Sequence, residues 1–296
     1  MKYKEEDLQQ LHEVQKGMLA EFIRVCNKYN IRYFVSFGTA IGTVRHQGFI
    51  PWDDDIDIGM VREDYEKLRQ VPVSEWQNDV FLCDPKDDVE FHLWNYPRLY
   101  KKNTVFETNF HHKYTRTGKD GSQPLHIWMD IFMFDRFTSV ESEQKKRKKA
   151  LVLRDAYYYS KARIICKKNA SVKQRLSCAL KNTFHYVSKL IPNCPEKICR
   201  YYERHIPEQN GEYIVAIGLR SNERRYVFKY EDYFPTVQGQ FESMTVELPR
   251  NYDKILNAIY YGSYMTVPPV EKQINHAPLF LDFGDGVIHE SICDDE

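Results

Sequence analysis

The acidic stretch DDDIDIGM at residues 53–60 constrains this chain more than any other feature. Apolar residues occupy every second position from its fourth residue onward. Side chains alternate between the two faces of a strand, so Asp53, Asp55 and Asp57 share one face while the apolar residues share the other. The sequence therefore predicts a strand with one buried face and a row of carboxylates, from which Asp54 is separated.

The segment before the acids predicts a phosphate-binding turn. A buried strand is expected over Tyr33–Phe37, which is rich in β-branched and aromatic residues. Gly38 ends that strand, and a short helix follows from Thr39. Free N–H groups at a helix start favour phosphate oxygens. Arg45 and His46 add positive charge just downstream, and we count them as substrate-binding candidates.

A third acid interrupts a strongly apolar segment. Asp130 lies within PLHIWMDIFMFD, where a carboxylate needs a cation or a hydrogen-bond partner. Asp55 and Asp57, at alternate positions of one strand, have Cβ atoms roughly 7 Å apart and can close on one hard cation. We expect Mg²⁺ or Mn²⁺ there, with Asp130 as a further ligand or as the acceptor of a proton.

The three acids and the turn together favour phosphoryl-type transfer, in which positioning and charge neutralisation supply most of the catalysis. An Asp-x-Asp pattern also occurs in glycosyltransferases that bind a nucleotide sugar, and a nucleotidyltransferase is equally compatible. Trp52, Trp94 and Trp128 are interpreted as core residues, with an aromatic box for a quaternary ammonium group as the alternative.

The rest of the chain predicts a single domain of α/β (α+β) class. An amphipathic helix is expected over residues 5–28, a helix over 62–71, and strands within 96–106 and 124–135. We assign residues 1–141 to the core, 142–206 to a basic helical elaboration and 207–296 to the C-terminal part of the catalytic domain. His92, His111, His112 and His289 are expected to be structural.

The net charge of zero is unevenly distributed, because the middle of the chain is strongly basic. Residues 145–200 hold sixteen Lys and Arg against Asp155 and Glu196, so this segment carries about +14. It is either a solvated helical face or a contact for a polyanion or an anionic membrane surface. A non-catalytic polyanion-binding module is therefore a rival to the enzymatic interpretation. We expect no nucleic-acid partner.

The chain is expected to be cytoplasmic, with a peripheral contact at the inner face of a membrane left open. Its charged start lacks the apolar run of a signal peptide, and no later stretch approaches eighteen consecutive apolar residues. Seven scattered cysteines are typical of reduced thiols.

The stretch GTAIGTVRHQGFIPWDDDIDIGMVREDYEKL resembles, almost position by position, the signature of the LicD family, which includes bacterial phosphocholine transferases and, distantly, fukutin and fukutin-related protein. The resemblance continues in YPRLYKKNTVF, in HIWMDIFMFD and in the tail from Tyr233 to His276. Residues 142–206 carry no matching motif.

The resemblance implies a nucleotidyltransferase-like core with a mixed sheet. It implies that Gly38 and Thr39 form the nucleotide-phosphate turn and that Asp55 and Asp57 hold the metal. Asp130 is the third carboxylate by the same resemblance. Asp53 matches a family acid and is included among the metal ligands.

Three further substrate-binding residues are expected from the matching segments: Lys101, Lys272 and His276. The stretch PPVEKQINH departs from the more basic run expected before that histidine, with Gln273 where a cation would help a phosphate.

The implied reaction takes phosphocholine, or a related phospho-alcohol such as phosphoribitol or phosphoglycerol, from a CDP-activated donor. The acceptor is a hydroxyl of a cell-surface glycan, such as a lipopolysaccharide, a teichoic acid or a lipid-linked precursor, and CMP is released. The sequence leaves open which alcohol and which acceptor are used, the oligomeric state and the number of metal ions.

Overall fold

The structure is a computed structural model that describes residues 2–83, 97–107, 126–161, 163–164, 166, 169–208, 210–216 and 226–291. His92, Trp94, His111 and His112 lie outside the described residues, so the expectations for these side chains stay predictions.

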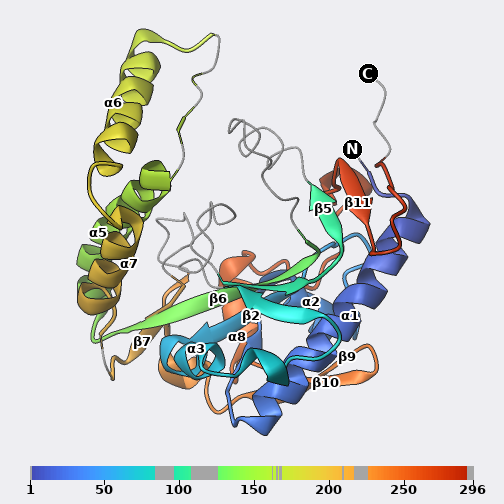
Figure 1. Ribbon diagram of the computed structural model, residues 1–296. Coiled ribbons are helices and arrows are strands. Elements are labelled where there is room, and N and C mark those ends of the chain that lie inside the picture. The colour runs from blue at the N-terminus through green and yellow to red at the C-terminus, as the bar shows by residue number, and fades with distance from the viewer. Residues whose placement is uncertain are drawn as a thin grey trace.

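A mixed, curled sheet forms the centre of the molecule (Figure 1). Among the described residues its strand order is β1-β2-β6-β4-β3, and β7 and β8 extend it beyond the far end of β6. β2 and β6 run parallel, whereas the other pairs are antiparallel. The strands are β1 (Phe34–Val35), β2 (Asp57–Val61), β3 (Val80–Cys83), β4 (Arg98–Lys101), β6 (Trp128–Phe137), β7 (Tyr213–Val215) and β8 (Phe228–Lys229). The predicted mixed α/β class is confirmed.

Four helices pack around this sheet: α1 (Glu5–Lys28), α2 (Phe37–Arg45), α3 (Arg62–Arg69) and α8 (Tyr252–Ile259). α1 is the predicted amphipathic helix, and Leu11, Met18 and Phe22 of its apolar stripe are fully buried. The main core cluster combines residues of α1 and β2 with Phe241 and Val246 near the C-terminus. Sequence-distant parts of the chain therefore share one core.

The predicted basic elaboration is a helical unit of α5 (Val140–Lys161), α6 (Val172–Ser188) and α7 (Cys194–His205). Figure 1 shows these helices together, beyond the end of β6 that leads into them. A largely buried ion pair lies where the unit meets the sheet: Arg62 of α3 donates to Asp135 of β6 at 2.5 and 3.0 Å. Tyr202 of α7 donates to the same carboxylate at 2.7 Å, so α7 is attached to β6 through a side chain.

Two small ladders complete the fold. β9 (Val237–Phe241) and β10 (Met244–Leu248) form a hairpin beside α2, and β5 (Val105–Glu107) pairs with β11 (Phe280–Asp282). Within the described residues there are also three short 3-10 turns: η1 (Val73–Glu75), η3 (Tyr230–Asp232) and η4 (Val270–Lys272). Sequence reasoning did not predict β3, β9, β10 or β11.

Two predicted boundaries near the acids are wrong. The strand expected over Tyr33–Phe37 ends at Val35, and α2 begins already at Phe37, whose φ is +43°. The strand expected from Asp53 begins only at Asp57. On the β1 side residues 53–56 have no strand partner, because β1 ends at Val35 and α2 follows almost at once. The last backbone hydrogen bond on that side runs from the Ser36 N–H to the Asp57 carbonyl, at 2.9 Å.

Within the described ranges, none of the helices combines the length and the apolar character needed to cross a bilayer.

Candidate active site

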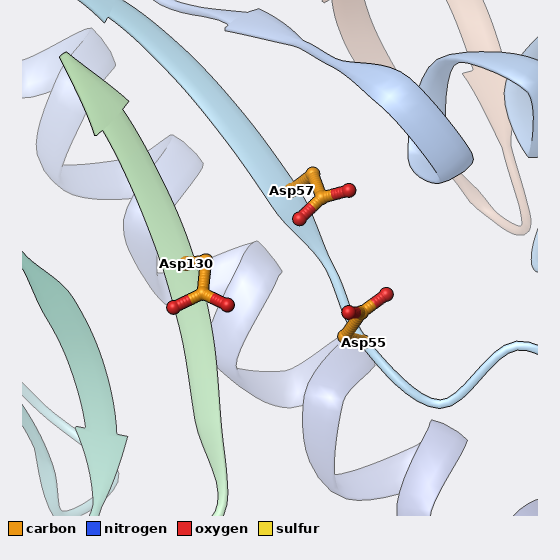
Figure 2. A group of neighbouring side chains, drawn as sticks. All are labelled: Asp55, Asp57 and Asp130. Carbon is orange, nitrogen blue, oxygen red and sulfur yellow. The ribbon is translucent and has the colours of Figure 1, made fainter. Parts of the chain in front are cut away.

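Three carboxylates converge where β2 and β6 lie side by side (Figure 2). Asp57 is the first residue of β2, Asp55 precedes it by two positions, and Asp130 is the third residue of β6. One oxygen from each of the three side chains lies within 4.8 Å of the others. The predicted convergence of these acids is thus what the structure contains.

Backbone pairing places the acids. Parallel pairing sets Asp57 directly opposite Asp130, so both side chains leave the sheet on the same face. The Asp130 N–H donates to the Ile56 carbonyl at 3.0 Å, which extends this pairing toward Asp55. On the other side, the Asp57 N–H donates to the buried Thr39 hydroxyl at 2.8 Å. Thr39 therefore positions the acid.

Arg98 of β4 holds Asp130 in place. Its Nε donates to Asp130 Oδ1 at 2.6 Å, and both side chains are largely buried. The Trp128 indole donates to the other oxygen at 3.3 Å, and the guanidinium lies 4.3 Å from the centre of the indole ring. One face of Trp128 is thus already occupied by a cation, so this residue is not a free wall of an aromatic box.

Burial makes the charged form of the other two acids unfavourable. Burial raises the pKa of Asp57 well above its usual range, and the charges of Asp55 and Asp130 raise it further. Burial and the charges of Asp53 and Asp54 have the same effect on the pKa of Asp55. Neither Asp55 nor Asp57 forms an ion pair within the described part of the chain. Among the described residues, only the His276 charge partly offsets the raised pKa of Asp55, and no side-chain cation contacts either carboxylate directly.

Asp54 has a separate, structural environment, as the period-two pattern predicts. Its buried carboxylate accepts from the Tyr3 hydroxyl at 2.7 Å and from the His276 N–H at 2.9 Å. The His276 ring lies 3.3 Å from the other oxygen, and this hydrogen bond raises the pKa of His276 to about 9. Asp54 therefore ties both ends of the chain to the site. A small pocket beside Asp55 is lined by Gln15 and His276, among others.

Asp53 does not belong to the group of three. Its carboxylate lies against the first turn of α2, where a Cβ added to Gly38 would meet Asp53 Oδ2 at 2.5 Å. A larger residue at this position would therefore displace the Asp53 carboxylate. Burial raises the pKa of Asp53 to about 6, with a further contribution from Asp54. A helix N-terminus favours an anion, so Asp53 stands where a donor phosphate was expected.

The other predicted substrate-binding residues lie in different surroundings. The Arg45 guanidinium donates to the Tyr264 carbonyl at 2.6 Å and to His46 at 2.9 Å, so it fixes α2 to a C-terminal segment. Lys101 donates to the Asn78 carbonyl at 2.6 Å. Lys272 lies exposed in η4. In the described structure neither lysine is hydrogen-bonded or ion-paired to the three acids.

The donor set fits a divalent cation. Oxygen ligands from two or three carboxylates, with positions left for water or phosphate, are what Mg²⁺ and Mn²⁺ prefer. A cation between Asp55, Asp57 and Asp130 would offset both the burial and the mutual repulsion that raise the pKa values of Asp55 and Asp57. These three residues are therefore the candidate ligands.

Arg98 was missed by sequence reasoning, although a signal exists. It lies at the start of the strand RLYK, whose first three residues are buried. A buried arginine in a strand needs an acidic partner, which a neighbouring strand can provide. The strand register identifies this partner as Asp130, because Arg98 lies directly opposite it.

Fold and site together define an α/β protein in which three carboxylates converge at two adjacent parallel strands. Residues 30–169 match the family described as "LicD/FKTN/FKRP, nucleotidyltransferase domain". A lipopolysaccharide cholinephosphotransferase LicD of Haemophilus influenzae is 26% identical over 268 residues, which are 88% of this chain and 92% of that protein. These two matches confirm the resemblance of the chain to the LicD family.

Two further relatives are uncharacterised proteins of Rickettsia prowazekii and Rickettsia typhi. They are 54% and 52% identical over 44 residues, which are 15% of this chain and 16% and 14% of those proteins.

Proposed function

We propose that this chain is a transferase that moves phosphocholine, or a related phospho-alcohol, from a CDP-activated donor to a hydroxyl of a cell-surface glycan such as lipopolysaccharide. The observation that carries the proposal is the convergence of Asp55, Asp57 and Asp130 at one point of the sheet. The name of the Haemophilus influenzae relative supports the transferred group and the acceptor class. The CDP donor is the part that the family resemblance implies.

In the proposed reaction the acceptor oxygen bonds to the phosphorus of the phospho-alcohol, and the bond from that phosphorus to the bridging oxygen breaks. CMP leaves with the electron pair, and the hydroxyl proton goes to a base. Asp55 and Asp57 would hold a divalent cation, which would neutralise charge on the phosphates. A nucleotidyltransferase-like core suits this chemistry, because the two reactions differ only in which side of the pyrophosphate is attacked.

Asp130 is the proposed proton acceptor. Arg98 and Trp128 engage its two oxygens from the sheet side, and each carboxylate oxygen has a second lone pair. The ion pair thus orients the carboxylate and leaves it capacity toward the acceptor. Asp55 and Asp57 are not paired with Arg98. We therefore assign the metal-ligand role to Asp55 and Asp57 and the base role to Asp130.

The test replaces Asp57 or Asp130 by Asn and measures CMP release from CDP-choline, CDP-ribitol and CDP-glycerol with lipopolysaccharide or teichoic acid as acceptor. Loss of a charged ligand or base is expected to lower kcat by at least about 10²-fold. The matched control is the exposed acid variant Asp285→Asn, which should retain full activity. Full activity in Asp57→Asn would disprove the site assignment.

Mass spectrometry of the acceptor separates this reaction from its two enzymatic alternatives. A gain of the phospho-alcohol mass supports the proposal. A gain of a nucleotide indicates a nucleotidyltransferase, and a gain of a sugar indicates a glycosyltransferase. Either of these results would overturn the proposed reaction while leaving the site in place.

A further inference from the structure

Helix α6 presents an apolar stripe to solvent. Its side chains at successive turns, and two just beyond its end, are exposed: Val172 84%, Leu176 61%, Leu180 65%, Phe184 37%, Val187 49%, Leu190 82% and Ile191 45%. The spacing of three and four residues places them on one face of the helix. Isolated exposed leucines are ordinary, but a continuous apolar stripe of this length marks an interaction surface.

The opposite face of α6 attaches the helix to the protein, and it is polar. His185 and Ser188 are buried there, and the His185 ring is hydrogen-bonded to the Tyr159 carbonyl of α5 at 3.0 Å. The Asn182 side chain exchanges hydrogen bonds with the Ile164 backbone at 2.8 and 3.0 Å. Leu176 and His185 are nine positions apart, which is about 180° around a helix.

This arrangement is the reverse of a surface helix in a water-soluble domain. Such a helix buries its apolar stripe against the core and exposes its polar face. α6 has a polar inward face and an apolar outward face. The apolar side chains are therefore removed from water only when an apolar partner covers the outward face. In Figure 1 α6 lies at the end of the helical unit farthest from the sheet. Its apolar stripe is exposed to solvent there.

Charge identifies the partner. Lys173, Arg175 and Lys189 flank the stripe and are exposed, and the surrounding segment 145–200 carries sixteen basic residues against two acids. A helix with aliphatic and aromatic residues on one face and lysines beside them is the pattern of a helix that lies in a membrane interface. Anionic headgroups attract such a basic surface. A second copy of this chain is disfavoured, since two segments of about +14 would face each other.

We propose that α6 lies in the surface of an anionic lipid bilayer, with the stripe from Val172 to Ile191 inserted among the acyl chains and the flanking basic residues at the headgroups. The contact is independent of the proposed reaction, because neither the three acids nor a donor takes part in it. Binding and catalysis can therefore fail separately.

The experiment is co-sedimentation of the full chain with vesicles of phosphatidylcholine alone or with 30% phosphatidylglycerol. The double variant Leu176→Gln, Leu180→Gln is expected to bind anionic vesicles at least tenfold more weakly than the wild type. Lys173→Gln with Arg175→Gln is expected to lower binding about fivefold per charge removed, with little effect on neutral vesicles. Higher salt should reduce binding of the wild type.

The matched control, Val73→Gln with Val287→Gln, replaces two exposed apolar residues outside the helical unit and should bind as the wild type does. Circular dichroism of each variant checks the fold, and all four apolar positions are exposed. Unaltered binding by the Leu176→Gln, Leu180→Gln variant would overturn the proposal, as would failure of the wild type to bind anionic vesicles. So would a lipid-free dimer in sedimentation velocity that these leucine substitutions convert to monomer.

Discussion

Neighbouring aspartates of the acidic stretch have opposite roles because their side chains enter different surroundings. Asp54 is buried with two hydrogen-bond donors, Tyr3 and His276. Asp55 faces other carboxylates, and its pKa is raised by burial and by their charges. A buried carboxylate whose oxygens accept hydrogen bonds contributes to the fold. A buried carboxylate among other acids is a candidate ligand for a cation. The partners of each side chain therefore decide its role.

Arg98 is expected to be the most sensitive single residue outside the cluster. Arg98→Met removes the guanidinium that pairs with Asp130 and leaves this acid beside Asp55 and Asp57. Breaking such a largely buried pair is expected to lower the free energy of unfolding by about 3–5 kcal/mol. Urea unfolding in metal-free buffer measures this loss. Arg98→Lys should recover part of the stability but less of the activity, because an ammonium cannot reproduce the oriented guanidinium contact.

The control for this prediction is Arg69→Met, which removes a more exposed pair with Glu66 in α3. Surface pairs contribute at most about 1 kcal/mol, so this variant should unfold close to the wild type. Equal stability losses in both arginine variants would show that Arg98 does not hold Asp130 as described.

At the scale of elements, β6 connects the site to the helical unit. Its first residues carry Asp130, and its last residues pair with β7 and reach α7 through Asp135. Glu208, which follows α7, contacts the segment just after β6. Its carboxylate accepts hydrogen bonds from the Thr138 N–H at 2.6 Å, from the Ser142 hydroxyl and from Lys146 at 2.8 Å. The start of α5 is thereby fixed to the segment that follows α7.

Glu208→Gln is expected to destabilise the protein in a pH-dependent manner. Burial opposes the charged form, but Lys146 and the hydroxyl donors outweigh it and lower the pKa of Glu208 from 4.5 to about 2. A group with a lowered folded-state pKa stabilises above its unfolded pKa and loses that contribution as pH falls through the folded value. The variant should be about 1–2 kcal/mol less stable at pH 7.

Denaturant unfolding at pH values from 7 to 2 checks this prediction. The difference between wild type and Glu208→Gln should be constant down to about pH 4.5 and shrink below it. A difference that stays the same at pH 2 would mean that hydrogen-bond geometry, and not charge, accounts for the effect.

At the scale of the whole molecule, a cation bound at the carboxylate cluster would stabilise the fold, because the acids come together only in the folded state. Free Mg²⁺ at about 100 times its Kd should add about 2.7 kcal/mol to the free energy of unfolding. Differential scanning fluorimetry with Mg²⁺ and with Ca²⁺ or EDTA measures the corresponding rise in Tm. The rise should diminish from pH 8 to pH 6, because protons compete for carboxylates whose pKa values are raised.

Asp57→Asn should remove this Mg²⁺ response. In EDTA the same variant should be at least as stable as the wild type, since it relieves repulsion among buried acids. Asp285→Asn, an exposed acid, is the control and should respond to Mg²⁺ as the wild type does. A full response in Asp57→Asn would place the cation elsewhere.

Local periodicity in the sequence by itself determined the separation of Asp54 from Asp55 and Asp57, the amphipathic helix α1, and the presence of a costly acid within β6. Periodicity is a property of neighbouring residues, so it can be read without the fold. The tertiary structure alone decided that Asp130 lies opposite Asp57, that Arg98 is its partner, and that Asp53 turns toward Gly38. Strand register and the direction in which a helix faces depend on contacts between distant segments. For the same reason, only the tertiary structure decides that the apolar stripe of α6 faces outward, because the polar face of the helix packs against α5.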